Sequence, residues 1–151
     1  MAGPRRRWAT GAAALLGTAL AVCLAGVASA GGNGGALFGK DYRSKSIVRD
    51  GERYELVDGG RVSVAFEARD DYDVVRWHAE CNYFGARVRA RERRLVIGRP
   101  EGTEIGCPPD QVRQDAWITR FFKRDPLWRR DGRNLNLISR SRDDAIRLRA
   151  R

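Results

Sequence analysis

Apolar side chains recur at every second position over most of the chain that follows Tyr42. In most runs they alternate with polar or charged residues, a spacing typical of β-strands that bury one face. The apolar positions are Val62, Val64 and Phe66; Val75, Trp77, Ala79 and Cys81; Ala86, Val88 and Ala90; Leu95 and Ile97; Leu135 and Leu137; and Ile146, Leu148 and Ala150. This pattern predicts a mainly β domain.

Short turn signals separate these runs. They are Asp50-Gly51, Asp58-Gly59-Gly60, Asp70-Asp71, Asp131-Gly132 and Asp143-Asp144. Connections of a few residues are too short for the crossovers that parallel strands require. We therefore expect a single antiparallel sheet, curved or closed into a partly open barrel.

One segment has helical spacing instead. It follows Pro108-Pro109, with Asp110 as the expected N-cap, and it ends at Asp125-Pro126. Its expected apolar face consists of Val112, Ala116, Trp117, Ile118, Phe121 and Phe122. The predicted fold class is thus mainly β (α+β), with one helix packed on the sheet.

The first thirty residues resemble a secretory signal peptide. Arg5, Arg6 and Arg7 precede a run without charge, and Ala28-Ser29-Ala30 places small residues where a signal peptidase cuts. We expect a signal peptide at 1–30, a flexible Gly-rich leader at 31–37 and one domain at 38–151.

Two alternatives to cleavage after Ala30 stay open. Cys23 follows a sequence close to a lipoprotein cleavage box, although Val22 is bulkier than the residue that usually precedes the cysteine. The uncharged run is also nearly as long as a membrane-spanning helix, so an uncleaved anchor is the second alternative. All three interpretations place the domain in the cell envelope or outside the cell.

Two cysteines, Cys81 and Cys107, remain in the expected domain, with 25 residues between them. In an oxidising compartment we expect them to form a disulfide, which would stabilise the fold by roughly 3–4 kcal/mol. The alternative is a pair of buried thiols that pack as small apolar groups. We expect Asn82 to be a structural turn or bulge residue, because asparagine tolerates unusual backbone angles.

The order of these motifs resembles the META domain family, also called the HslJ-like family. The resemblance rests on Cys81-Asn82, Gly85 and Cys107-Pro108, with Glu80 where the family usually has glycine. It extends to the helix and to the last strands of the chain. The resemblance implies a compact, β-rich and often exported domain for which no catalytic residues are established.

Other combinations of residues offer little chemistry. His78 and Cys81 are three positions apart, which places them on opposite faces of a strand. With a single histidine and three cysteines we expect neither a metal site nor a cofactor. The acidic turn residues Asp70, Asp71 and Asp73 lack the later ligands of a calcium loop.

The excess of arginine is the feature of the composition that bears most on a binding function. The chain has 29 basic and 19 acidic residues, a net charge of +10, and only three of the basic residues are lysine. Two outward strand faces are expected to carry candidate anion-binding residues: Arg87, Arg89 and Arg91 on one, Arg147 and Arg149 on the other. If the stripes are neighbours they form one basic surface; the alternative is that arginine only supplies the polar outer face.

These observations favour an exported, non-enzymatic binding or stress-related module, expected to be a monomer. Its expected partner is an anionic envelope polymer or an exported protein, and not nucleic acid, since no nucleic-acid-binding motif is present. One alternative is a small secreted inhibitor that acts through the loop at 99–106. Another is an envelope enzyme that uses carboxylates such as Glu67, Glu80 and Glu104, or the region of His78 and Cys81.

Overall fold

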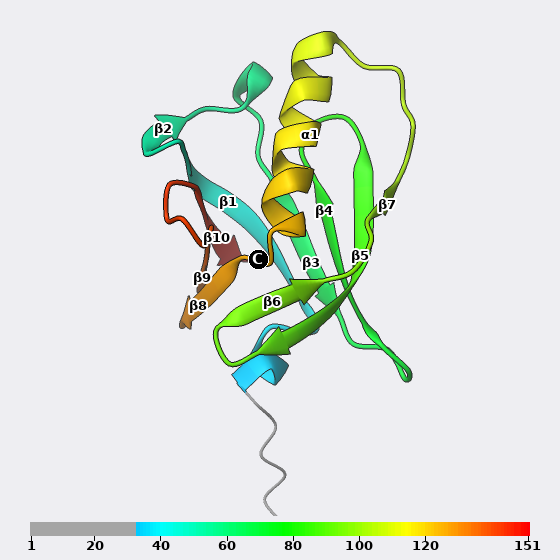
Figure 1. Ribbon diagram of the computed structural model, residues 1–151, viewed down its shortest axis with the longest axis vertical. Helices are drawn as coiled ribbons and strands as arrows, with labels where there is room; N and C mark the ends of the chain where they lie inside the picture. The colour runs from blue at the N-terminus through cyan, green and yellow to red at the C-terminus, as the bar shows by residue number, and fades with distance from the viewer. Residues whose placement is uncertain (1–32) are drawn as a thin grey trace, which may run out of the picture.

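The computed structural model describes residues 33–151, so the predicted signal peptide at 1–30 and Cys23 lie outside the described residues. The domain consists of ten strands, one α-helix and two short 3-10 turns (Figure 1). The strands are β1 (Lys40–Arg49), β2 (Glu52–Tyr54), β3 (Ser63–Glu67), β4 (Asp73–His78), β5 (Tyr83–Arg91), β6 (Arg94–Ile97), β7 (Glu101–Gly102), β8 (Leu127–Asp131), β9 (Asn134–Ile138) and β10 (Ala145–Ala150). The helical elements are η1 (Asn33–Ala36), η2 (Val57–Gly59) and α1 (Pro109–Lys123).

All strands belong to one antiparallel sheet that closes on itself. The order of neighbours is β10-β9-β8-β6-β5-β4-β3-β1, and β10 also pairs with β1 to complete a barrel of eight strands. The two short strands lie outside this ring, β2 beside β1 and β7 beside β5. The predicted single antiparallel sheet with one helix is confirmed, and the barrel is closed.

The closure is uneven around the ring. β1 and β10 are paired from Tyr42 opposite Ala150 to Val48 opposite Ala145, with one irregularity between Ser44 and Ser46. By contrast, β6 and β8 share a single register pair, Arg94 opposite Leu127. The junction between β6 and β8 is therefore the narrowest pairing in the ring.

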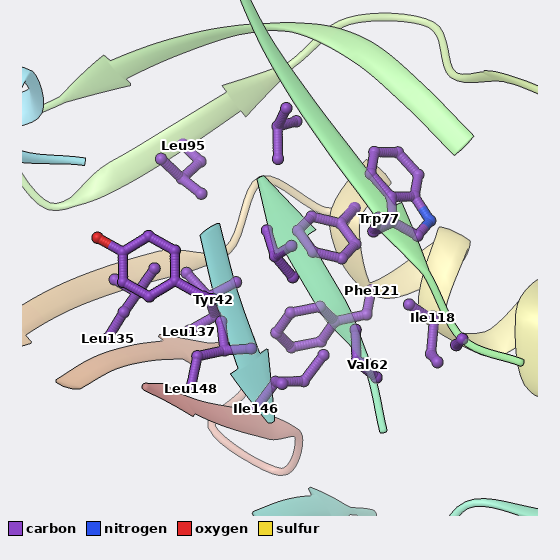
Figure 2. Packing of buried hydrophobic residues seen from close by; sticks show 14 of the residues in the cluster. Tyr42, Val62, Trp77, Leu95, Ile118, Phe121, Leu135, Leu137, Ile146 and Leu148 are labelled. Atoms are coloured by element: carbon purple, nitrogen blue, oxygen red, sulfur yellow. The ribbon is translucent and has the colours of Figure 1, made fainter. Parts of the chain in front are cut away.

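The alternating side chains fill the barrel as the sequence predicts. Val64 and Phe66 of β3, Val75 and Trp77 of β4, and Val88 of β5 are all at most 2 % exposed. Tyr42 packs edge-on against Phe66, with ring centroids 6.0 Å apart. Figure 2 shows the ring of Tyr42 beside Leu135 and Leu137 of β9 and Leu148 of β10.

Helix α1 lies against the sheet in front of β3 and β4 (Figure 1). Phe122 stacks on Trp77 with ring centroids 4.4 Å apart, and Ile118 is fully buried. Apolar surface on one side of the helix thus covers the core, which is the main stabilising term for such an element.

The predicted helix face is wrong at two positions, and so is the predicted N-cap. Val112 is 46 % exposed and Ala116 is also exposed, whereas Gln114 and Asp115 are buried. The N-cap position is occupied by Pro108, and Asp110 lies within the first turn, where a carboxylate favours the helix dipole. The helix is rotated from the expected face because Gln114 and Asp115 bond to loops of the barrel.

The packed part of the chain begins before Phe38. η1 ends at Ala36, and Leu37 is fully buried in the core cluster. The carbonyl oxygen of Ala36 accepts a hydrogen bond of 2.9 Å from Arg130. Within residues 33–151, no helix is long and apolar enough to cross a membrane.

Candidate functional site

The motif residue Asn82 organises one end of the barrel. Glu80, two positions before it, adopts a left-handed φ of 79°, a conformation that glycine adopts more readily than other residues. The side-chain oxygen of Asn82 accepts hydrogen bonds from Oγ1 of Thr103 (2.9 Å) and from the backbone nitrogen of Ile105 (2.8 Å). Its side-chain amide donates to Oδ2 of Asp115 at 3.2 Å. Asn82 thereby joins the loop after β7 to helix α1, the structural role that the sequence predicts.

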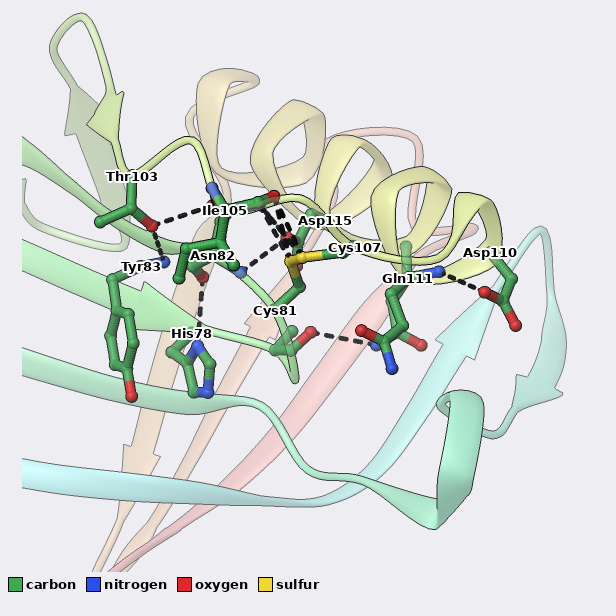
Figure 3. Close-up of a disulfide and its surroundings, with 12 residues drawn as sticks. His78, Cys81, Asn82, Tyr83, Thr103, Ile105, Cys107, Asp110, Gln111 and Asp115 are labelled. Atoms are coloured by element: carbon green, nitrogen blue, oxygen red, sulfur yellow. Dashed lines mark hydrogen bonds between the residues drawn. A yellow bond between two sulfur atoms is a disulfide. The ribbon is translucent and has the colours of Figure 1, made fainter.

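The disulfide between Cys81 and Cys107 lies beside this network (Figure 3). Their Cα atoms are 6.3 Å apart, and Cys107 immediately precedes Pro108 at the start of α1. The bridge therefore holds the beginning of the helix against the end of β4. The alternative of two separate thiols does not describe this structure.

His78 and Tyr83 form an aromatic pair on the outer face of the sheet. The two residues are opposite each other in the β4–β5 register, and their rings stack with centroids 4.0 Å apart and planes 8° apart. Nδ1 of His78 donates to the carbonyl oxygen of Asn82 at 3.1 Å, which orients the ring. Tyr83 is 59 % exposed, so the pair presents an aromatic surface to solvent (Figure 3).

A groove of about 740 Å³ runs beside this pair. The next row of the sheet forms its floor, in which Arg76 of β4 lies between two small residues, Ala65 of β3 and Gly85 of β5. Asp41 continues the row on β1 and Glu101 continues it on β7. The groove is thus flanked by one carboxylate at each end, with Arg76 between them, and Arg151 also lines it.

A second recess, of about 540 Å³, adjoins the groove. Four arginines line it: Arg69, Arg76, Arg87 and Arg99. The guanidinium carbon of Arg87 lies 4.4 Å from the ring centroid of Tyr72, and that of Arg69 lies 5.9 Å from the same centroid. We call this the arginine recess. The tyrosine ring positions two of its cations by cation–π attraction.

Glu67 holds two of the four arginines. Its Oε2 accepts from Arg69 at 3.1 Å and from Arg76 at 3.2 Å. Hydrogen bonds to Glu67 and Tyr72 raise the pKa of Arg69 above its ordinary value, so this side chain stays charged. Among the described residues, Arg87 and Arg99 have no carboxylate within 4.0 Å.

The META domain profile matches residues 35–151, which is nearly the whole described chain. The chain belongs to the META domain family. The position of Asn82, with Cys81, Gly85, Cys107 and Pro108 around it, gives the family motif a structural meaning, since these residues join β4, β5 and α1.

Solved structures share the fold of this META domain. An NMR structure of a protein from Burkholderia xenovorans superposes with a TM-score of 0.62 at 11 % identity, covering 78 % of this chain and 85 % of that one. A second NMR structure superposes with a TM-score of 0.56 at 14 % identity, covering 76 % and 92 %. None of the curated proteins matches this sequence.

The two arginine stripes of this META domain are not neighbours. β5 carries Arg87, Arg89 and Arg91, and β10 carries Arg147 and Arg149, each exposed. The order of strands places β5 and β10 four steps apart in either direction, on opposite sides of the barrel. The condition for a single basic surface, that the two stripes be neighbours, is therefore not met.

Arg87 is the one member of either stripe that lines the arginine recess. Arg89 and Arg91 lie farther along β5, opposite Val96 and Arg94 of β6. Sequence reasoning missed Arg69, Tyr72, Arg76 and Arg99. They come from a turn, a neighbouring strand and a loop, and only the pairing of β4 with β5 brings them together.

The candidate catalytic carboxylates are also separate. Glu67 lies at one end of the β3–β4 pair, whereas Glu80 lies beyond the other end and accepts from the backbone nitrogen of Arg61. Glu104 is exposed on the loop after β7. In the described part of the chain, no three His, Cys, Asp or Glu side chains are grouped so that they could hold a metal ion.

The loop at 99–106 is held against the barrel. Glu101 and Gly102 pair with β5, and Thr103 and Ile105 bond to Asn82. Ile105 remains 51 % exposed. The loop is thus a fixed edge of the groove.

Proposed function

We propose that this META domain is an exported, non-catalytic binding module that takes an anionic ligand in the arginine recess. The observation that carries the proposal is the convergence of Arg69, Arg76, Arg87 and Arg99 on one recess of about 540 Å³. Planar guanidinium groups can donate paired hydrogen bonds to carboxylate, sulfate or phosphate. A ligand that carries such groups is therefore the chemistry that the recess fits best.

The charges at the recess favour an anion. Its four arginines are accompanied by two nearby carboxylates, Glu67 and Glu101, which leaves a local excess of two positive charges. Because Glu67 compensates Arg69 and Arg76, Arg87 and Arg99 are the cations with most unused hydrogen-bonding capacity. An incoming anion would accept hydrogen bonds from these two guanidinium groups. The electrostatic attraction that brings it to the recess would act over a shorter range at higher salt concentration.

The spacing of carboxylates along the groove supports a binding role over catalysis. Asp41 and Glu101 are separated by four strand-to-strand steps, about 19 Å along the sheet at the usual strand spacing. Glycoside hydrolases place their paired carboxylates within roughly 5–10 Å. These two carboxylates are placed to flank a ligand and are too far apart to act on one bond.

Export is supported by the sequence of residues 1–30 and by the disulfide. Disulfides persist mainly in oxidising compartments. The proposed partner is accordingly an anionic polymer of the cell envelope.

The test compares two variants that remove equal charge from two different parts of the barrel. R69S/R87S/R99S removes three arginines of the recess, and R129S/R147S/R149S removes three exposed arginines of β8 and β10. Binding of polygalacturonate and of poly-L-glutamate is measured with protein purified from cells that express the whole chain. We expect the recess variant to lose at least about tenfold in affinity for both polymers and to show a flatter salt dependence.

The control variant should change affinity by less than about threefold, since exposed charges away from a contact act through screened long-range attraction. Equal losses in both variants would mean that net charge alone attracts the polymers. That result, or unchanged binding by the recess variant, would overturn the proposal. Shortening of polygalacturonate during incubation would instead identify an enzyme.

A further inference from the structure

The groove beside the arginine recess has features that an anion site does not need. Tyr83 is 59 % exposed, yet its ring is held parallel to that of His78, which in turn is oriented by the carbonyl oxygen of Asn82. Figure 3 shows the two rings side by side at the edge of the sheet. A large ring that is both exposed and fixed offers an apolar face at low entropic cost.

The floor of the groove is open because its residues are small. A Cβ atom on Gly85 would lie 3.6 Å from Cγ of Arg76, so the site could accommodate a larger residue, but the groove would lose depth. Ala65 and Ser63 continue the low floor on β3. A flat ligand can therefore approach the sheet between Tyr83 and Arg76.

The flanking carboxylates point to a ligand with hydroxyl groups. Among the described residues, neither Asp41 nor Glu101 has a side-chain hydrogen bond or a cation within 4.0 Å. An ionised carboxylate only accepts hydrogen bonds, and hydroxyl groups are donors that it can use.

The groove and the recess are continuous. Arg76, Gly85 and Glu101 line both of them. From Tyr83 to Arg87 the distance along β5 is about 13 Å at the usual rise of a strand. That length suits a short chain of rings better than a single small molecule.

We propose that groove and recess together bind an acidic glycan, a polymer of sugar rings that carry carboxylates. One ring would lie on Tyr83, its hydroxyl groups would donate to Asp41 or Glu101, and a carboxylate farther along would meet Arg76 and Arg87. The inference rests on the proposed function, because it assigns the ligand class of the same face. Beyond the proposed function, it states that the protein recognises the sugar rings of the ligand as well as its negative charge.

Single-stranded nucleic acid also combines rings with negative charge, and proteins bind it by stacking and basic grooves. Within its chain, the sugar of DNA has no free hydroxyl group and that of RNA has one, so nucleic acid offers fewer hydroxyl donors to Asp41 and Glu101 than a uronate ring does. The two carboxylates of the groove therefore favour the glycan, and nucleic acid becomes an outcome of the test.

The experiment measures the affinity of the whole-chain protein for three anionic polymers that carry one negative charge per repeat unit: polygalacturonate, poly-L-glutamate and oligo(dT). Three variants accompany the wild type. Y83A removes the exposed ring, Y83F keeps the ring without its hydroxyl group, and G85V raises the floor of the groove. Circular dichroism and thermal unfolding check that each variant folds, as expected for substitutions on the outer face.

We expect the wild type to bind polygalacturonate at least about tenfold more tightly than poly-L-glutamate. Y83A and G85V should abolish this preference while leaving the affinity for poly-L-glutamate within about twofold, and Y83F should retain it. An equal affinity for both polymers, or a preference that Y83A leaves intact, would overturn the glycan assignment. Tightest binding of oligo(dT) would overturn it in favour of nucleic acid.

The two proposals fail in different ways. If the polymers bind equally but the R69S/R87S/R99S variant loses both, the anion recess stands and the glycan assignment is lost. If that variant behaves like R129S/R147S/R149S, the recess itself is lost.

Discussion

Asn82 and Asp115 are joined by two hydrogen bonds, although they belong to different elements of the fold. Oδ2 of Asp115 accepts from the backbone nitrogen of Asn82 at 2.9 Å and from its side-chain amide at 3.2 Å. Both residues are buried, with 8 % and 4 % of their surface exposed. Among the residues that the structure describes, both donors to the carboxylate on α1 therefore come from the turn that holds Asn82.

Replacing Asn82 tests the importance of that contact. N82A removes one of the two donors to Asp115 and leaves the backbone nitrogen of Ile105 without its partner, and we expect it to lower the free energy of unfolding by about 3 kcal/mol. N82D should be more destabilising near pH 7 than near pH 4, because it sets a second carboxylate against Asp115. Urea unfolding at the two pH values measures both effects. An N82D variant whose stability does not depend on pH would contradict this account.

The disulfide should stabilise the domain substantially. Cys81 and Cys107 close a loop with a sequence separation of 26, for which the chain-entropy model gives roughly 3–4 kcal/mol. We expect C81S/C107S to lose about this much unfolding free energy, and reduction of the wild type to have a similar effect. The double variant is the control, since a reducing agent should leave its denaturation curve unchanged.

Tyr42 should make the domain less stable in alkali. Burial raises the pKa of its phenol above the ordinary 10.0, with Arg130 acting in the opposite direction as the smaller effect. The unfolded chain then loses this proton at a lower pH than the folded domain, so stability falls as the pH rises above about 10. Its hydroxyl group has no hydrogen-bond partner among the described residues.

Y42F should therefore be at least as stable as the wild type at pH 8, by up to about 1 kcal/mol. Its advantage should grow at about pH 11, where only the wild type carries the buried phenol. Guanidinium unfolding at both pH values measures the difference, and the other tyrosines are common to both proteins. A constant difference across this range would be the contrary result.

Neutralising Glu67 should strengthen anion binding. Its carboxylate occupies Arg69 and Arg76, and E67Q releases both guanidinium groups while removing a negative charge from the recess. Because exposed ion pairs contribute roughly 0.2–1 kcal/mol each, we expect about two- to tenfold tighter binding of poly-L-glutamate at low salt. E55Q, which removes an equally charged residue paired with Arg53 away from the recess, is the control. Weaker binding by E67Q would mean that Glu67 is needed to position the arginines.

The strands could be predicted because their signal is local. Alternation along β3, β5 and β10 identifies the buried faces without knowledge of any neighbour, and the structure buries Val64, Val88 and Leu148 accordingly. The face of α1 could not be predicted in the same way. Gln114 is buried because its side chain bonds to the backbone of Val57 and Ala79, and such partners are distant in sequence.

The candidate site depended on the order of strands around the barrel. Two stripes that look equivalent in sequence, at Arg87 and at Arg147, are separated by the ring, and only the first has a recess beside it. Arg69 and Arg99 lie on turns and loops that bring them next to Arg87. The course of such segments cannot be predicted from the spacing of apolar residues. The sequence could therefore predict which strands carry exposed arginines. Which arginines lie together in one recess could be seen only from the folded structure.

The pairing of β1 with β10 determines when this domain can form. The first and last strands of the ring are neighbours in space, so their contacts are among the most distant in sequence, a topology associated with slow folding. A nascent chain must keep β1 without this partner until β10 has been synthesised. During that interval β1 and β9 each expose a strand edge that can pair with other chains. The pairing of β10 with both edges therefore completes the barrel and also removes the sites at which the unfinished domain is most prone to aggregate.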